Sequence, residues 1–273
     1  MNGKMINRMR AAGLVLLLMT TAAAVNATGN AQHEPYIRLK SGQTLEVKTL
    51  KALDEQGNLA FENHDGSFIM SRRLYDYAVV PQPSAIAAAV KMLQENRAEA
   101  ALKAFGELER QYRYLGWAYY CRYYRMMALQ QLKRDGEMLQ LPDPSEQVKD
   151  EDLSAAERRH RWQCRRLQAE AYLHSHQENK AEELWQRIAG CPEDDLAAGA
   201  YNRQADLKLS RRHPEAALTL YLRPIFMFER HTAGREYALR QVVRLMREQQ
   251  DPRLKNFTAM LNQEYPEKKT DQP

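Results

Sequence analysis

The 273-residue sequence lacks the short motifs that mark many catalytic centres. It contains no H-E-x-x-H metal motif, no G-x-S-x-G nucleophile turn and no glycine-rich loop that could cradle phosphates. His160 and Cys164 are one helical turn apart, but no third ligand lies at a spacing suitable for zinc. Acidic pairs such as Glu107 and Glu109 lie in stretches that look exposed, and nothing selects them for acid–base chemistry. We therefore expect no metal ion and no cofactor, and we rank an enzyme behind two kinds of binding protein.

Acidic residues are also absent before Glu34, in a region typical of a cleavable secretory signal. A 15-residue run of small and apolar residues, Ala11–Val25, follows three basic residues: Lys4, Arg8 and Arg10. Small residues suit cleavage after Ala27, and the bond after Ala31 is a second candidate. The pattern predicts a signal peptide at residues 1–27 and an exported chain, periplasmic or extracellular. An uncleaved membrane anchor is the alternative.

Later apolar runs fall short of the roughly 18 residues that a membrane-spanning helix needs, so the mature chain should be soluble. Removal of residues 1–27 takes away three positive charges and no negative ones, which lowers the formal net charge from +5 to +2. The basic character of the whole sequence is thus partly a property of the signal. It gives no support for a nucleic-acid partner.

Cysteine is scarce, with only Cys121, Cys164 and Cys191. In an oxidising compartment such residues tend to pair, and an odd count leaves at least one thiol over. Cys164 lies 13 residues before Gln177 and Cys191 lies 14 residues after it. If the chain reverses between two helices at Gln177, these two cysteines lie opposite each other, and we name them as the candidate disulfide.

Residues 36–80 consist of short runs rich in β-branched and aromatic residues, separated by turns that contain Gly42, Gly57 and Gly66. Such spacing predicts a small antiparallel β module, either a sheet or a barrel. These 45 residues are few for an independent core, so the module should dock on the rest of the chain. Pro81 and Pro83 mark its end.

From Ser84 onwards the chain is expected to be almost entirely helical, and one spacing recurs three times. A small residue is followed by Ala 12 positions later and by an aromatic residue 16 positions later. The nine positions are Ala89, Ala101 and Phe105; Ala169, Ala181 and Trp185; and Ala205, Ala217 and Tyr221. This spacing resembles the tetratricopeptide repeat (TPR), in which small residues lie where two antiparallel helices cross. The resemblance implies a mainly α fold, a TPR-like α-α solenoid over residues 84–265 preceded by the small β module.

The repeat spacing is interrupted between Ala101 and Ala181, which are 80 residues apart. One long helix over residues 112–134 and an acidic linker that ends at Asp152 are expected in this interval. The other helices are expected at 85–95, 98–110, 154–175, 178–190, 195–211, 215–229, 233–249 and 252–264. Residues 266–273 have little apolar content and should form a flexible tail.

The predicted helix over residues 112–134 is unusually rich in tyrosine and arginine. Its aromatic arc is too broad for a single buried stripe, and Tyr and Arg are favoured at binding hot spots. We therefore name Trp117, Tyr120, Tyr124 and Arg125 as candidate partner-binding residues. The alternative is a central helix buried on both sides, whose tyrosine hydroxyls reach polar partners.

A second candidate surface is the basic stretch that follows the acidic linker, from which we name Arg158 and Arg165. It could hold an anion or an acidic peptide, dock the acidic residues Asp150–Asp152 of the linker, or be a solvated helix face.

These features predict an exported scaffold that binds a protein or peptide, because stacked helix pairs leave an extended concave surface. The alternative is a module that binds carbohydrate or another envelope polymer by stacking sugar rings on the Tyr/Trp-rich helix. An enzyme is the third class.

Overall fold

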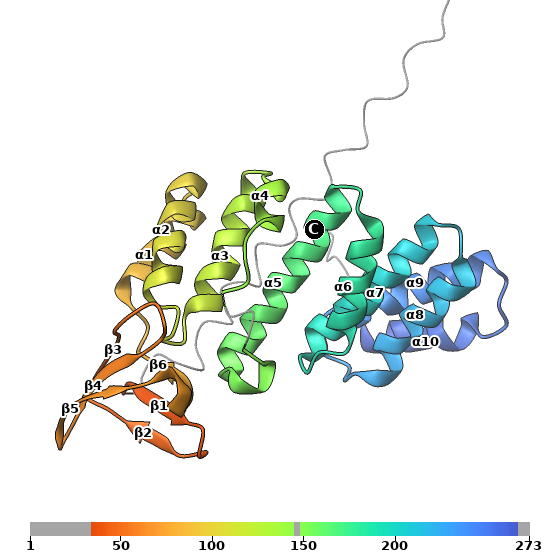
Figure 1. Cartoon of the computed structure of the whole chain (residues 1–273). Coiled ribbons are helices and arrows are strands. Elements are labelled where there is room, and N and C mark those ends of the chain that lie inside the picture. Colours follow the sequence, from red (N-terminus) through yellow and green to blue (C-terminus); the bar gives the residue numbers. More distant parts are fainter. Residues whose placement is uncertain (1–33, 145–147, 267–273) are drawn as a thin grey trace, which may run out of the picture.

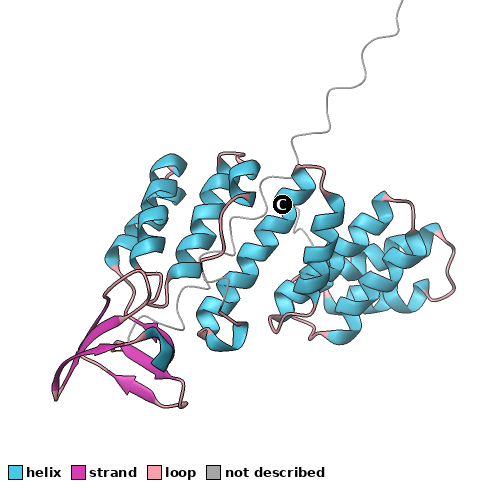
Figure 2. Cartoon of the chain, viewed as in Figure 1, coloured by secondary structure: helices cyan, strands magenta, loops and turns pink. Residues whose placement is uncertain are grey.

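The computed structural model describes residues 34–144 and 148–266. The predicted signal peptide, and all but the first residue of the predicted tail, lie outside the described residues. Within them, six β-strands are followed by ten α-helices (Figures 1 and 2).

The strands form two three-stranded antiparallel sheets at one end of the molecule (Figure 2). The sheet with the order β2-β1-β6 consists of β1 (Tyr36–Leu39), β2 (Thr44–Glu46) and β6 (Tyr75–Val79). The sheet with the order β3-β4-β5 consists of β3 (Thr49–Ala52), β4 (Leu59–Asn63) and β5 (Gly66–Met70). Buried strand residues such as Ile37 and Leu59 share one apolar cluster with Ile86 and Phe105 of the helices. The β module is therefore joined to the helical part by a common core.

The helices form a row of hairpins in which each helix contacts the next (Figure 1). Their bounds are α1 (Ser84–Gln94), α2 (Ala98–Gln111), α3 (Ala118–Gln131), α4 (Asp135–Leu139), α5 (Ala155–His174), α6 (Glu178–Ala189), α7 (Asp194–Ser210), α8 (Pro214–Met227), α9 (Arg235–Glu248) and α10 (Leu254–Glu264). The predicted fold class, a mainly α chain of stacked helix pairs behind a small antiparallel β module, is confirmed.

The odd-numbered helices contact one another as well: α1 contacts α3, α3 contacts α5, α5 contacts α7 and α7 contacts α9. They form one continuous layer of the stack, which we call the odd-helix layer. Each hairpin buries its apolar side only against its neighbours, as in other repeat architectures.

Five hairpin turns share one backbone conformation. Each has a residue other than glycine with φ between 55° and 62° at its centre: Asn96, Lys133, His176, Arg212 and Gln250. At the third turn Gln177 N donates to Tyr172 O at 2.8 Å and His176 N donates to Leu173 O at 3.0 Å, and the other four turns repeat both bonds. These bonds satisfy carbonyls at the helix end in the Schellman arrangement. Residues 84–144 and 148–266 therefore contain five helix hairpins, where the sequence spacing detects three.

All nine residues of the recurring spacing are at most 1% exposed. Counted from the positive-φ residue of each hairpin, the two small residues lie at −7 and +5 and the aromatic residue at +9. In the second hairpin Met126 and Met138 take the two small positions and are equally buried. Pro142 stands at the aromatic position, beyond the end of α4. The second hairpin thus keeps the geometry of the others with different side chains.

The prediction of one long helix over residues 112–134 is wrong. The chain leaves α2 at Gln111, turns over residues 112–117, and begins a separate helix, α3. Gly116 allows this turn, because its φ is +82° and a Cβ there would lie 3.1 Å from Val79 Cγ2. The break lets β6 approach the helices closely.

The candidate disulfide between Cys164 and Cys191 is not formed, and all three cysteines are free and buried. Cys164 faces α3, where its Sγ lies 3.8 Å from the carbonyl oxygen of Tyr119. Cys191 lies beyond the end of α6, in a different apolar cluster, with its Sγ 3.5 Å from Glu193 O. The near-symmetry about Gln177 fails because the two side chains point to different neighbours.

We expect Ala181→Leu and Ala217→Leu each to lower the free energy of unfolding by about 1–3 kcal/mol, because both alanines are fully buried at helix contacts and a larger side chain overpacks them. Ala216→Leu is the matched control, since Ala216 is exposed on the same helix as Ala217. Urea denaturation of the three variants measures the difference. Equal losses at Ala216 and Ala217 would contradict the assignment of these alanines to the core.

Candidate functional site

Three of the candidate residues lie in an aromatic cluster between α2, α3 and α5. The ring of Tyr124 stacks on Phe105 at a centroid distance of 5.4 Å, and Tyr120 lies 4.8 Å from Tyr124. Trp117 meets Tyr120 edge to face at 5.3 Å, and the His160 ring of α5 lies 4.9 Å from Tyr120. Because these rings cover one another, little of the cluster is open to a ligand.

Trp117 joins the helices to the β module. It is 5% exposed, and its indole N–H donates to Val80 O at 2.9 Å. Val80 N donates to Leu115 O at 3.3 Å, and the Tyr114 hydroxyl donates to Glu55 O at 2.8 Å. The expectation that Trp117 faces a partner is therefore wrong, because its ring is part of the common core.

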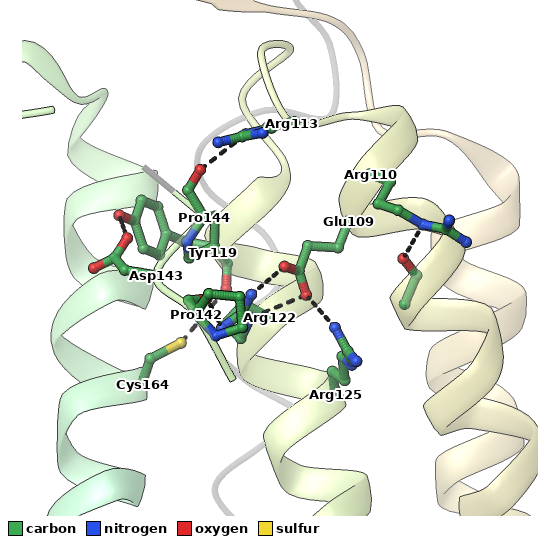
Figure 3. A network of polar contacts seen from close by, with 11 residues as sticks. Glu109, Arg110, Arg113, Tyr119, Arg122, Arg125, Pro142, Asp143, Pro144 and Cys164 are labelled. Carbon is green, nitrogen blue, oxygen red and sulfur yellow. Dashed lines mark hydrogen bonds and ion pairs between the residues drawn. The ribbon is translucent and has the colours of Figure 1, made fainter. Parts of the chain in front are cut away.

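Arg125 belongs to an ion cluster around Glu109 that Figure 3 shows. Arg122 donates from Nε to Glu109 Oε2 at 3.0 Å and pairs through Nη2 with the other carboxylate oxygen. Arg125 Nη1 lies 3.3 Å from Glu109 Oε2. The side chains of Arg122 and Glu109 are 5% and 9% exposed, so this bidentate pair is buried and links α2 to α3.

The segment between α4 and α5, described at residues 140–144 and 148–154, crosses this region, and we call it the strap. Arg122 Nη1 donates to Pro142 O, the Tyr119 hydroxyl donates to Asp143, and Arg113 Nε donates to Pro144 O at 2.9 Å (Figure 3). Side chains of the α2–α3 turn and of α3 therefore hold the strap.

The basic side of α5 holds the strap from the other direction. Arg161 is 6% exposed and donates to Val148 O at 2.7 Å and to Asp150 Oδ1 at 3.0 Å. Arg165 Nη1 lies 3.5 Å from Asp150 Oδ2, and its guanidinium covers the Trp162 ring at 4.2 Å. Arg158 is half-buried, and no hydrogen-bond partner of its Nε is found in the described part of the chain. Of the three expected roles of this basic stretch, the structure shows the dock for the acidic linker at Asp150.

The odd-helix layer carries a row of polar contacts between neighbouring helices. Arg166 of α5 lies near Tyr123 of α3, where burial raises the pKa of the phenol and the Arg166 charge opposes that shift. Arg203 Nε of α7 donates to Glu170 Oε1 of α5 at 2.9 Å. The Tyr237 hydroxyl of α9 donates to Asp206 Oδ1 of α7 at 2.8 Å. These contacts tie four hairpins together, while Arg203 and Tyr237 stay 49% and 42% exposed.

Glu157 is a buried carboxyl that the sequence did not single out. It lines a cavity of about 30 Å³ between β6 and the start of α5, together with Arg72 and Arg113. Burial raises the pKa of Glu157 to about 7, against the opposing effects of the Arg72 charge and a hydrogen bond from the backbone N–H of Ala118. A cavity of this size has room for one or two water molecules and is too small for a substrate, so we assign Glu157 a role in the structure.

The pKa of His160 is shifted in the opposite direction, downwards. Burial lowers the pKa of this imidazole to about 4, although Nδ1 lies 2.8 Å from Ala156 O. The ring is therefore neutral at pH 7 and contributes to the aromatic cluster as an uncharged group.

Among residues 34–144 and 148–266, no group of three or more His, Cys, Asp or Glu side chains could hold a metal ion. None of the helices in these ranges combines the length and the apolar content needed to cross a bilayer.

No protein-family model matches the chain, and no curated protein matches it. Two solved structures resemble part of it, both crystal structures of nearly identical TPR-like repeats of a putative kinesin light chain from Podosopora anserina. The first has a TM-score of 0.46 and 12% sequence identity, over 66% of this chain and 92% of that chain. The second has a TM-score of 0.43 and 13% identity, over 66% and 93%. Contacts between successive helices of this chain define its hairpins directly.

Two features of the site could not have been selected from the sequence. The polar contacts of the odd-helix layer join residues 31 to 43 positions apart, and no short motif marks them. Glu157 stands among arginines in the sequence, where a solvated ion pair is the natural expectation.

Trp117→Ala should lower the free energy of unfolding by about 3–5 kcal/mol, because it opens a cavity in the common core and leaves Val80 O without its donor. Tyr237→Ala removes a half-exposed ring and one hydrogen bond, so its loss should be about 1 kcal/mol. Thermal denaturation of both variants tests this difference. A Trp117 variant as stable as the parent chain would show that the indole does not anchor the β module.

Glu157→Gln should stabilise the protein at pH 8 and have little effect near pH 4. The folded-state pKa of about 7 lies above the unfolded value of about 4.3, so the parent chain loses stability as pH rises between these values. The glutamine variant keeps a neutral acceptor for Ala118 N–H and avoids this loss, which amounts to about 4 kcal/mol above pH 7. Denaturant titrations of both proteins from pH 4 to pH 8 measure the difference. A gap that stays constant with pH would contradict the burial of an ionising carboxyl.

Proposed function

We propose that the chain is an exported scaffold that binds an extended segment of a partner protein on the odd-helix layer, in the periplasm or outside the cell. The observation that carries this proposal is the continuity of that layer. Its helices contact one another through five hairpins, and polar side chains tie α3, α5, α7 and α9 together. A surface built in advance loses little entropy when a partner binds.

The exposed side chains of the layer are suited to protein recognition. Arg203, Tyr237 and Arg240 are between 42% and 49% exposed, and Tyr and Arg contribute strongly to protein interfaces. Arg203 and Arg240 are held by carboxylates of Glu170 and Glu236, which fixes their guanidinium groups before a partner arrives. This arrangement favours a partner with backbone carbonyls or carboxylates that accept from the remaining N–H groups.

Export is supported by the sequence of residues 1–27, with its basic start, short apolar run and small residues before Ala27. The carbohydrate alternative has lost its best support, because sugar stacking needs open ring faces and the rings of Trp117, Tyr120 and Tyr124 cover one another. No specific observation favours an enzyme.

A double variant, Tyr237→Ala with Arg240→Ala, should lose the partner, because it removes an aromatic anchor and a charged donor from α9. The matched control is Gln186→Ala with Arg187→Ala, a pair of exposed residues on the even-numbered helix α6. Each form is expressed from its full gene, recovered from the envelope fraction after cross-linking, and compared by quantitative mass spectrometry. The intact mass of the bait reports on removal of residues 1–27.

The proposal predicts one or more proteins captured by the parent chain and by the α6 control and lost from the α9 variant. Equal capture by all three forms would exclude the odd-helix layer as the binding surface. A bait that keeps residues 1–27 would exclude the exported form.

A further inference from the structure

The outer edge of β5 carries no neighbouring strand among the described residues. In Figure 1 this strand lies at the far end of the β module, away from the helices. β5 pairs with β4 on one side only, in a register that runs from Asn63 opposite Gly66 to Leu59 opposite Met70. An edge of this kind presents unpaired backbone groups to the solvent.

The register identifies those groups. Asn63 and Gly66 flank a two-residue turn and form the first hydrogen-bonded pair of the hairpin, so the alternation of an antiparallel ladder directs Phe68 and Met70 towards β4 as well. The N–H and C=O groups of Ser67 and Ile69 therefore point away from β4. They form two donors and two acceptors on the outer edge.

This edge also lacks the features that usually protect an exposed strand. The five residues of β5 include no charged residue and no proline, whereas the edge strands β2 and β3 contain Glu46 and Lys51. Ile69 is 72% exposed and Phe68 is 43% exposed, so apolar area lies on both sides of the free backbone groups. Edges are normally blocked by charge or proline because they otherwise pair with another chain.

We propose that β5 is a docking edge for a second copy of this chain, and that two copies pair through antiparallel β5 strands. The occupant follows from the self-complementarity of the edge. When two β5 strands meet about a two-fold axis at Phe68, Ser67 of each copy lies opposite Ile69 of the other. All four outward donors and acceptors of each copy then find partners, so that the strands form four hydrogen bonds.

The side chains of β5 are compatible with this antiparallel pairing of two copies. Phe68 lies opposite Phe68 of the second copy as a non-hydrogen-bonded pair, in which side chains approach most closely. Its ring is already held by stacking on Phe61, with centroids 5.6 Å apart. The strand carries no charge, so the two copies do not repel each other at the contact.

A contact between two five-residue strands buries far less than the roughly 1,200–2,000 Å² of a stable interface. The dimer is therefore weak and forms at high local concentration. Pairing at β5 joins the two molecules at their β modules and leaves the odd-helix layers free, so this inference does not depend on the proposed function.

Sedimentation equilibrium of the purified chain, from micromolar to millimolar concentration, should show a monomer–dimer equilibrium. Ser67→Pro removes one outward N–H and leaves the ladder to β4 intact, and Ile69→Lys places like charges across the contact. Each change should weaken dimerisation by about tenfold or more, which corresponds to about 1.4 kcal/mol. Thr49→Lys on the opposite edge strand is the control, and its dimerisation should be unchanged.

Amide hydrogen exchange of the unmodified chain tests the edge without a variant. Exchange at Ser67 and Ile69 should slow as the protein concentration rises, while exchange at Phe68 should not change. A chain that stays monomeric at every concentration overturns the proposal, as does a dimer that both β5 variants leave intact. Protection of Ser67 and Ile69 only by an added peptide with the sequence of residues 64–72 would show an edge for foreign strands and would also overturn self-pairing.

Discussion

The stack depends on how the chain compensates for α4, which stops after five residues. A helix this short cannot cover the apolar sides of both its neighbours, and a gap in a repeat array would separate the β module and first hairpin from the last three. Two substitutes close the gap. α3 contacts α5 directly, with Met126, Cys164 and Leu167 in one apolar cluster, and the strap covers what remains. Buried arginines hold the strap through its carbonyl groups and carboxylates.

Arginine suits this position because a single guanidinium can serve several acceptors at once. Arg122 reaches both oxygens of Glu109 and a strap carbonyl, and Arg161 reaches a carbonyl and two carboxylates. Lysine could not reproduce that planar geometry. Buried pairs of this type contribute little net stability, yet removal of one member leaves an uncompensated charge. The cluster therefore acts mainly to fix the path of the strap between α3 and α5.

The sequence predicted the fold class well because its strongest signals are local. Spacing and turn residues located the β module, the helical region and the three hairpins with Ala at their crossings. The sequence-based prediction failed where a tertiary contact determines the local structure. The predicted helix over residues 112–134 breaks at Gly116 because β6 passes close to that residue. The second hairpin was missed because Met126 and Met138 occupy its two small-residue positions, where the repeat spacing expects alanine. Tyrosine and arginine on α3 resemble a binding surface by composition alone, and burial against the β module is invisible to composition. The contacts of the odd-helix layer were missed because each joins two different hairpins.

The location of the buried aromatic residues narrows the search for a partner surface. The β module covers one end of the stack and the strap crosses its interior between α3 and α5, so the side chains of α3 and the basic side of α5 make internal contacts. Towards α9 no such cover is described, and exposed arginine and tyrosine side chains remain on the odd-numbered helices. Residues that are held in place yet still exposed can recognise a partner without first giving up a contact of the fold. The proposed recognition surface therefore includes Arg203 of α7 and Tyr237 of α9, which the repeat architecture holds in position while they stay 49% and 42% exposed.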